Sequence, residues 1–522
     1  MTNYAHVPVE EAAVTGMAVA VHAANKPHDT SVIDSLGAYS WEYLNQRSNQ
    51  LARCMRELGL CEDDSVALLC GNRVEFIEVM MAAFRSGIRV TPINWHLTAE
   101  EIAYIVDNCD AKILFAEGQF GSKVAEATGM LKKIERYLSI GDDIEGFSPY
   151  LDAILNHDDR NIDVPVHGGT MLYTSGTTGR PKGVFRADRP PILPDFSEIG
   201  YARGDGVNLC TGPAYHAAPL LIDVLTPIIS GATVVFMEKW DPGESLRLIE
   251  QHKVTHCHMV ATMFHRLLQL PREKKEQHDL SSMRLIIHGA APCPVHVKHA
   301  MIEWFGPVLI EYYAATEGGG GFLIGSEEWL TKPGSVGRPG PEFDNKIVDD
   351  EGNVVAQGDI GTIYMRAPDE GRFIYYKDQE KTDSSYAGDY FTLGDMGYFD
   401  EDGYLFLTGR TAELIISGGV NIYPQEVDSQ IMQHAAVLDV CTIGVPSDEW
   451  GEEVKSVIQL NKEFAPSVVL ERELIEFSRE RLPAFKCPRS VDFVDDLPRL
   501  PTGKIQRRTV REPYWESRDK SI

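Results

Sequence analysis

A chain of 522 residues is too long for one ordinary hydrophobic core, so its length predicts two or more domains. Hydrophobic residues make up 43% of the chain and charged residues 24%, which are ordinary values for a globular protein. The formal net charge of −28 argues against nucleic acid or an anionic membrane as the main partner, because the protein surface would repel both.

The nine cysteines are scattered without a Cys-x-x-Cys pair, which indicates a reduced chain with no disulfide framework and no zinc ribbon. No apolar run reaches the ~18–20 residues that a membrane span needs. The apolar stretch Ala12–Val21 follows Glu10 and Glu11 instead of a basic region, so a signal peptide is not favoured. We therefore expect a cytoplasmic enzyme or binding protein that holds any anionic ligand with local cations.

Helical and strand patterns alternate along the first part of the chain, between about residues 30 and 165. Helical periodicity is clear at 41–58, 75–87 and 98–109, and short apolar strands are expected at 64–72, 88–94 and 111–117. This alternation is typical of a mainly parallel sheet with helices on both faces.

A second α/β region extends from about Gly206 to Tyr313, with strands expected at 232–237, 255–260, 284–290 and 308–314. The second of these strands contains His256, Cys257 and His258. Neighbouring residues of a strand point to opposite faces, so a buried strand is favoured over a metal site there.

Short strands with glycine and acidic turns between Gly334 and Leu407 indicate a small β-domain, and a mixed tail follows Arg410. The predicted fold class is therefore α/β. We expect a large N-terminal domain, 1–410, with two α/β sheet subdomains and a small β-domain. A small, mobile α+β C-terminal domain is expected at 411–522.

The strongest motif is the segment Tyr173–Gly183, which has four serine or threonine hydroxyls, three glycines and two cations in eleven positions. Glycines let backbone N–H groups approach an anion, and hydroxyls add donors to phosphate oxygens. The alternative is a flexible surface loop. The segment lacks the spacing of a Walker A loop or of a dinucleotide-binding loop. The predicted phosphate-binding residues are Thr174, Ser175, Gly176, Thr177, Thr178, Gly179 and Lys182.

This segment resembles the phosphate-binding signature of the adenylate-forming superfamily, which includes acyl-CoA synthetases, adenylation domains of peptide synthetases and luciferases. The further motifs of that superfamily follow in the same order over essentially the whole chain: Gly289–Pro292, Tyr313–Glu317, Gly394–Asp395, Gly409–Arg410 with Gly418–Asn421, and Pro501–Lys504. Six motifs in register are highly specific, and the chain is most similar to the branch of fatty-acid, aryl and steroid acyl-CoA ligases.

The resemblance implies a nucleotide site built from several of these motifs. The residues expected to bind ATP or AMP are Gly289, Ala290, Ala291, Glu311, Tyr312, Tyr313, Asp395, Arg410 and Asn421. Either Tyr312 or Tyr313 could stack on the adenine, because glycines are common beside the family's tyrosine and are absent here. Asp395 is expected to accept the ribose hydroxyls, although an aspartate in an ordinary turn would look the same.

Catalytic roles also come from the resemblance. Thr316 is expected to donate to the α-phosphate, Glu317 to ligate Mg²⁺, and Lys504 to bridge the carboxylate and the α-phosphate. Taken singly, Glu317 and Lys504 could be solvated side chains. His216 matches the residue at the mouth of the acyl pocket, although a lone histidine is more often structural.

The acyl pocket is expected to involve His216, Ala217, Gly318 and Gly319. The run Gly318–Gly321 would leave room for a bulky or hydrophobic acid, or it could be a plain flexible loop. Implied CoA contacts are Gly418, Gly419 and Lys486. The hinge position holds Ala412 where the family usually has Asp or Lys, and we expect rotation to survive because a hinge needs only to tolerate a change of backbone angles.

The predicted function is an acyl-CoA ligase that uses ATP, Mg²⁺ and CoA. It would convert a small-molecule carboxylic acid to an acyl-adenylate and pyrophosphate, and CoA would then displace AMP. One alternative is a stand-alone adenylation enzyme that loads a carrier protein in trans, and a remote one is a non-catalytic nucleotide sensor. A homodimer is possible.

Overall fold

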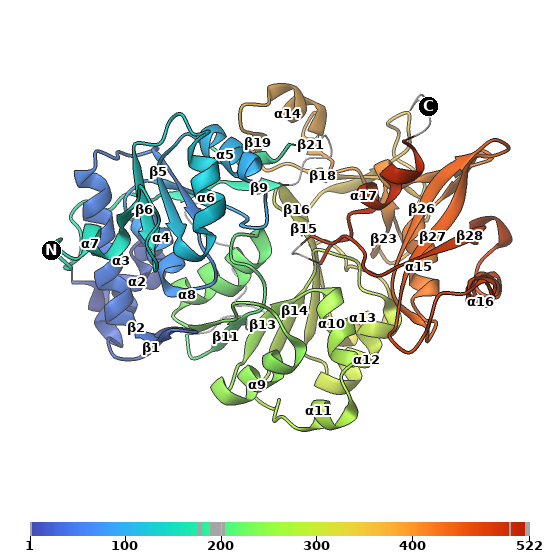
Figure 1. Cartoon of the computed structure of the whole chain (residues 1–522), viewed down its shortest axis with the longest axis horizontal. Helices are drawn as coiled ribbons and strands as arrows, with labels where there is room; N and C mark the ends of the chain where they lie inside the picture. The colour runs from blue at the N-terminus through green and yellow to red at the C-terminus, as the bar shows by residue number, and fades with distance from the viewer. Residues whose placement is uncertain (1–2, 175–179, 188–199, 201–203, 501–502, 517–522) are drawn as a thin grey trace.

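A computed structural model describes residues 3–174, 180–187, 200, 204–500 and 503–516 (Figure 1). The blue and green parts of the chain form a large unit, and the orange and red C-terminal part lies at its side. Among the described helices, none is long and apolar enough to cross a membrane.

The first large sheet has six parallel strands in the order β7-β6-β5-β3-β4-β8. Their bounds are Ser148–Pro149, Arg136–Ile140, Ala111–Glu117, Ser65–Leu69, Arg89–Pro92 and Gly169–Thr170. The associated helices are α3 Trp41–Glu57, α4 Val74–Phe84, α5 Ala99–Asn108, α6 Gly121–Thr128 and α7 Tyr150–Ile154. The predicted helices are thus confirmed, with ends that differ by up to three residues. Ser40 caps α3 by accepting from the Tyr43 N–H at 3.1 Å, as a serine at a helix N-terminus is expected to do.

The second sheet has eight strands in the order β16-β15-β14-β13-β11-β12-β1-β2, parallel except at its two edges. Their bounds are Gly318–Gly325, Leu309–Ala315, Leu285–His288, His256–Met259, Val207–Cys210, Thr233–Phe236, Thr30–Asp34 and Gly37–Ser40. The helices of this region are α2 Ala18–Asn25, the π-helix η4 Pro219–Leu225, α8 Thr226–Ser230, α9 Pro242–His252, α10 Ala261–Leu268, α11 Arg272–Glu276 and α12 Val295–Phe305.

One expectation about this sheet was wrong. The sequence pattern assigned the region from residue 30 onward to the first sheet, but β1 pairs with β12 of the second. Val32 lies opposite Val234 and is fully buried in a core that also contains Met80 and Val66 of the first subdomain. The strand therefore closes a hydrophobic core that both subdomains share. The local hydrophobic pattern does not indicate which sheet such a strand will join.

Smaller sheets cover the top of the large unit. A three-stranded sheet joins β9 Leu172–Thr174, β10 Lys182–Phe185 and β19 Ile374–Tyr375. The predicted small β-domain is a six-stranded sheet of β17 Asn345–Val348, β18 Gly361–Arg366, β20 Tyr386–Ala387, β21 Tyr390–Phe391, β22 Asp395–Phe399 and β23 Leu405–Arg410. Two helices accompany these strands, α13 Ser326–Thr331 and α14 Gln379–Ser385.

The C-terminal part has its own five-stranded sheet and its own hydrophobic clusters. Its elements are β24 Ile415–Ser417, β25 Val420–Ile422, α15 Pro424–Ile431, β26 Val437–Ser447, β27 Gly451–Leu460, α16 Val468–Arg479, β28 Ser490–Val494 and α17 Arg507–Arg511. A single 3₁₀ turn, Thr411–Glu413, connects it to β23 of the large unit. The predicted boundary between residues 410 and 411 therefore lies where one sheet ends and the connecting turn begins.

A buried ion pair fixes α12 against β15. The Lys298 Nζ lies 2.6 Å from Glu311 Oε2, with the lysine side chain fully buried and the glutamate 7% exposed. Nζ also lies 4.7 Å from the centre of the Trp329 ring. Burial lowers the pKa of Lys298, and the adjacent Glu311 carboxylate opposes that shift. Since neither charge reaches bulk water, each depends on the other for compensation.

We expect Lys298→Met to lower the free energy of unfolding by about 3–5 kcal/mol, because it leaves the Glu311 carboxylate buried without its cation. Urea unfolding measures this loss. The double variant Lys298→Met, Glu311→Leu should recover most of it, because both buried charges are then gone. A single-variant loss below about 1 kcal/mol, typical of a surface pair, would contradict this interpretation.

Candidate active site

A cavity of about 1740 Å³ opens between the large sheets, the small sheets and the C-terminal domain. It is lined by residues that are far apart in sequence, among them Thr174, Lys182, Tyr313, Arg410 and Lys504. Ala290 and Gly394 also line it, so the folded chain brings residues from all six predicted motifs to one space.

The predicted phosphate-binding loop connects β9 to β10. Thr174 is the last residue of β9 and lies opposite Lys182, the first residue of β10, so the two line the cavity from adjacent antiparallel strands. Burial lowers the pKa of the Lys182 ammonium. The loop's central residues, Ser175, Gly176, Thr177, Thr178 and Gly179, lie outside the described part of the chain.

Thr316 and Glu317 occupy the turn between β15 and β16, directly beside the cavity. The Tyr375 hydroxyl donates to Glu317 Oε1 at 2.8 Å. The Arg186 guanidinium donates to the backbone carbonyls of Glu317 at 2.6 Å and of Thr316 at 3.2 Å. Arg186 and Tyr375 therefore hold the turn, and the sequence analysis missed both because neither lies within a motif.

Asp395 is the centre of a hydrogen-bonded group at the start of β22. Its Oδ2 accepts from the Tyr313 hydroxyl at 2.7 Å, and its Oδ1 accepts from Arg410 Nε at 2.7 Å. Arg410 is the last residue of β23 and pairs in register with Asp395. Three predicted nucleotide-binding residues from two motif-bearing sheets are thus in direct contact.

The two adjacent tyrosines point to different surroundings. Tyr313 is bonded to Asp395, whereas the Tyr312 hydroxyl lies 3.1 Å from His258 Nε2 among apolar side chains that include Ile287. Gly289 fits closely against the Tyr312 ring, where a Cβ would lie 2.6 Å from a ring carbon. Tyr313 is therefore the tyrosine associated with the predicted ribose-binding carboxylate.

The short loop after β14 passes next to both tyrosines. Ala290 has a positive φ of 64°, an unusual conformation for a residue with a side chain. Ala290 and Ala291 line a second cavity that adjoins Tyr313 and Asp395. The Glu311 carboxylate, by contrast, accepts a hydrogen bond from Lys298. It is therefore not a free carboxylate for a nucleotide.

Lys504 reaches the cavity from the C-terminal domain. Burial lowers the pKa of its ammonium and the nearby Arg410 guanidinium lowers it further, while the carboxylates of Asp395, Glu413 and Glu317 oppose the shift. Gly503 before it has a φ of +80°, and a Cβ there would lie 2.5 Å from Thr262 Oγ1 of the large domain. The turn is therefore seated directly against the large domain.

The predicted CoA-binding residues are not brought to this cavity. Gly418, Gly419 and Lys486 are absent from its lining, and the Lys486 Nζ lies 2.7 Å from Glu426 Oε2. Asn421, which was predicted to bind the nucleotide, is absent from the lining as well. Gly418 packs on the Trp450 ring, with φ of +59°. Ala412 is exposed in the middle of the connecting 3₁₀ turn. In this arrangement Lys504 faces the cavity, and the segment 418–421 lies elsewhere.

One arm of the cavity is apolar. We use "apolar arm" for the part lined by Leu221, Ile222, Leu225, Ile229, Met81 and Phe84. His216 and Ala217 line the same cavity, as does Gly16, which closely approaches the backbone of Phe84. The π-helix η4 provides three of these side chains. π-Helices are rare and often occur at functional sites.

The glycine run forms the edge strand β16. Gly318 and Gly319, for which a role in the acyl pocket stays a prediction, line the cavity. The alternative of a plain flexible loop is wrong, because the run is paired with β15. A Cβ at Gly321 would lie 2.1 Å from the Phe343 ring, and one at Gly320 would lie 2.5 Å from Asn345 Oδ1. Gly320 and Gly321 therefore allow Asn345 and Phe343 to pack closely, while Gly318 and Gly319 leave space in the cavity.

His216 lines the same cavity as the residues of the apolar arm. Its Nε2 is buried and has no hydrogen-bond partner within the residues that the structure describes. Burial lowers the pKa of its imidazole to about 4. The ring is therefore neutral at pH 7.

This shift predicts a pH dependence of stability. Between pH 6.5 and 4 the unfolded chain binds a proton at His216 that the folded chain does not, so stability falls as the pH falls, by about 3 kcal/mol at most. In His216→Gln that contribution should be lost. Urea unfolding of variant and wild type should give a free-energy difference that changes between pH 6.5 and 4 and is constant above pH 7. Parallel curves over the whole range would contradict the assigned pKa.

Comparison with known proteins agrees with this geometry. The AMP-binding enzyme family matches residues 19–373, and the AMP-binding enzyme C-terminal domain matches residues 426–504. A feruloyl-CoA synthase of an Amycolatopsis species is 31% identical over 94% of this chain and 96% of its own length. A fatty acid–[acyl-carrier-protein] ligase, ScoC of Streptomyces coeruleorubidus, is 29% identical over 95% of both chains.

Solved structures show the same architecture. The anthranilate CoA ligase AuaEII in complex with anthranoyl-AMP has a TM-score of 0.88 at 25% identity and covers 99% of both chains. ATP-bound MatB from Rhodopseudomonas palustris has a TM-score of 0.82 at 28% identity, covering 96% of this chain and 99% of that one. The chain therefore belongs to the AMP-binding family of adenylate-forming enzymes, and it is an AMP-forming acid–thiol ligase.

Proposed function

We propose that the protein is an acyl-CoA ligase that activates a hydrophobic carboxylic acid with ATP and Mg²⁺. The observation that carries this proposal is the position of Lys504, which shares one cavity with Thr316, Glu317 and Arg410. A positioned ammonium beside hydroxyl and guanidinium donors can compensate the negative charge of a triphosphate and a carboxylate at the moment they react.

In the first step, a carboxylate oxygen of the acid bonds to the α-phosphorus of ATP, and the bond from that phosphorus to the bridging oxygen of pyrophosphate breaks. Thr316 would donate to the α-phosphate, and Lys504 would lie between it and the carboxylate. Asp395 would accept the ribose hydroxyls while Tyr313 stacks on the adenine. The protein mainly aligns the reactants and balances their charge, because no covalent enzyme intermediate is needed.

The residues also fit a magnesium ion. Glu317 presents a carboxylate beside the cavity, and the Tyr375 hydroxyl fixes its orientation through Oε1. Mg²⁺ prefers one or two carboxylates together with phosphate oxygens and water. When bound, the ion would supply charge compensation for the phosphates. Glu317 would hold it, and Arg186 would keep the Glu317 backbone in place.

In the second step, the C-terminal domain would rotate at Ala412, withdraw Lys504 and bring Gly418 and Gly419 to the cavity. The thiol sulfur of CoA then bonds to the acyl carbon, its proton passes to solvent, and AMP leaves. The placement of segment 418–421 away from the cavity supports this, because the present arrangement suits only the first step. Consumption of ATP and CoA agrees with a cytoplasmic location.

The apolar arm supports a hydrophobic acid. Its lining side chains, such as Leu221, Ile222 and Phe84, offer no charged partner for a second carboxylate. The neutral His216 in the same cavity adds no positive charge. Burial of apolar surface yields about 25 cal/mol per Å², so a longer apolar acid gains binding free energy along this arm.

A panel of acids tests the proposed reaction. Acetate, malonate, benzoate, ferulate, decanoate and palmitate are incubated with ATP and Mg²⁺, with and without CoA, and products are identified by mass spectrometry. We expect acyl-CoA from the apolar acids and none from malonate. Acyl-AMP without acyl-CoA across the panel would favour loading of a carrier protein, an activity named for the relative ScoC. No acyl-AMP from any acid would overturn the proposal.

Lys504→Ala tests the assigned role of the lysine. We expect pyrophosphate release to fall by about 10²–10³, since one charge-stabilising group is lost from the transition state. Conversion of synthetic acyl-AMP and CoA to acyl-CoA should stay within about twofold of wild type, as Lys504 has left the site by then. Lys462→Ala, an exposed lysine of the same domain, serves as the control. Unimpaired adenylation in Lys504→Ala would refute the role.

A further inference from the structure

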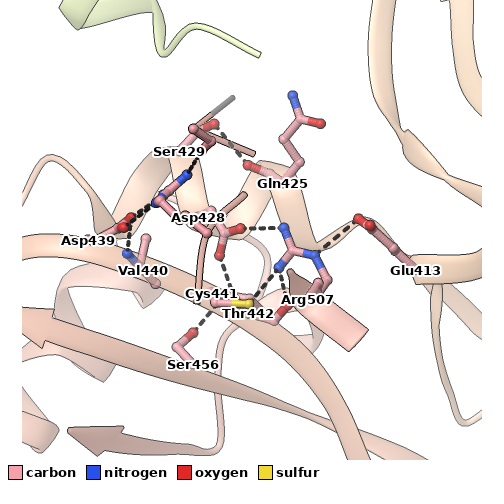
Figure 2. Close-up of polar contacts among 12 residues, drawn as sticks. Glu413, Gln425, Asp428, Ser429, Asp439, Val440, Cys441, Thr442, Ser456 and Arg507 are labelled. Carbon is pink, nitrogen blue, oxygen red and sulfur yellow. Dashed lines mark hydrogen bonds and ion pairs between the residues drawn. The ribbon is translucent and has the colours of Figure 1, made fainter. Parts of the chain in front are cut away.

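Arg507 is a buried arginine that follows Lys504 by three residues. It begins α17 and is 7% exposed. Its guanidinium contacts three separate segments of the C-terminal domain (Figure 2). Nε lies 3.1 Å from Glu413 Oε2, Nη2 lies 2.8 Å from Asp428 Oδ2 on α15, and Nη1 donates to the backbone carbonyl of Thr442 on β26. A planar guanidinium with all three nitrogens engaged holds its partners in a defined geometry.

The partner Glu413 belongs to the connection between the domains. It is the last residue of the 3₁₀ turn Thr411–Glu413 and directly follows Ala412, yet it lies 94 residues away from Arg507 in sequence. The contact thus connects the segment at which the domain would turn with the segment that carries Lys504. Figure 2 shows Glu413 and Asp428 on opposite sides of the same guanidinium.

The backbone between Arg507 and Lys504 is also tied down. The Leu500 N–H donates to the Lys504 carbonyl at 2.8 Å, and the Gln506 N–H donates to the Pro498 carbonyl at 2.8 Å. A shift of Arg507 is therefore passed to Lys504 through a short, hydrogen-bonded turn and is not absorbed by a loose loop. These two hydrogen bonds restrict the backbone at Lys504 and Gln506.

We propose that Arg507 is a positioning residue that couples the interdomain turn to Lys504. Its bonds to Glu413 and Asp428 make the turn, α15 and the Lys504 segment one rigid unit, so that rotation at Ala412 returns the Lys504 ammonium to a single place. This inference rests on the proposed two-step function. Because a misplacement of about 1 Å can cost on the order of 10²-fold in rate, loss of the coupling should slow adenylation strongly.

The competing explanation is that Arg507 only stabilises the domain. Burial raises the pKa of the Asp428 carboxyl, and both Arg507 and the Thr442 N–H, which donates to Asp428 Oδ1 at 2.7 Å, oppose that shift. The two explanations predict different effects on the two half-reactions. General loosening of the domain would impair both steps, whereas misplacement of Lys504 would impair adenylation alone.

The test measures each half-reaction separately in Arg507→Lys, Glu413→Gln and the double variant. Pyrophosphate release with ATP and the most active acid of the panel reports adenylation. Acyl-CoA formation from the matching synthetic acyl-AMP and CoA reports the second step. Glu413→Gln keeps the buried Arg507–Asp428 pair, so it should fold even if Arg507→Lys does not. Lys455→Gln, which breaks the 2.8 Å contact with Asp492 in the same domain, controls for general loosening.

We expect adenylation to fall by about 10–100-fold in Arg507→Lys and about 5–20-fold in Glu413→Gln, with less than a twofold change in the second step. The double variant should lose little beyond Arg507→Lys, since both remove one coupling. Equal losses in both half-reactions, or a loss in Lys455→Gln as large as in Glu413→Gln, would overturn the inference.

A second readout does not depend on catalysis. Acetylation of the Lys504 amine by an N-hydroxysuccinimide ester, followed by mass spectrometry, should be slow in wild type and severalfold faster in Glu413→Gln. Unchanged labelling would overturn the inference even if activity fell. A wild-type protein inactive towards every acid would instead refute the proposed function, and labelling would still decide whether Arg507 controls the position of Lys504.

Discussion

The close contact between Gly503 and Thr262 is the constraint on which the rest of the active site depends. A turn from the far end of the chain must lie against the large domain with no room for a Cβ, or the Lys504 ammonium does not reach the cavity. The charged groups Glu317, Asp395 and Arg410 belong to the large domain, whereas Lys504 and Arg499 come from the C-terminal domain. The contact between Gly503 and Thr262 thus accompanies the placement of the Lys504 ammonium at the cavity.

The large domain provides a rigid wall for that contact. Asp395 is fixed by Tyr313 and Arg410, and the strand that carries Tyr313 is fixed from behind by the buried Lys298–Glu311 pair. Preorganised groups cost little reorganisation when charge develops, which is why a fixed wall suits phosphoryl chemistry. In the proposed two-step reaction, the parts that move are the C-terminal domain and its short connection.

Much of this site could be predicted from the sequence, because its residues lie in compact motifs that combine unusual residue types. The motifs point to Thr316, Glu317, Asp395, Arg410 and Lys504. In the structure Thr316, Glu317, Arg410 and Lys504 line the large cavity, and Asp395 lines a second cavity that shares Arg410 and Lys504 with it. Helices with clear periodicity, such as α3 and α5, were also predicted to within a few residues.

The remaining features depend on contacts between distant segments, which leave no local pattern. Arg186, Tyr375 and Arg507 act through partners 58–131 residues away, so nothing near them in the sequence indicates their role. The placement of β1 in the second sheet is of the same kind, because an apolar strand fits either core. The run Gly318–Gly321 resembled a loop because glycine is depleted in strands, and only its close neighbours explain why a strand requires it there.

The π-helix η4 has a consequence for how this enzyme could change its acid. A π-turn contains one residue more than an α-turn, so deletion of a single residue from Pro219–Leu225 would return this segment towards α-helical spacing while the flanking residues keep their register. The spacing of Leu221, Ile222 and Leu225 along the wall of the apolar arm would then change. Deletion of one codon would therefore change the shape of the apolar arm in a single evolutionary step.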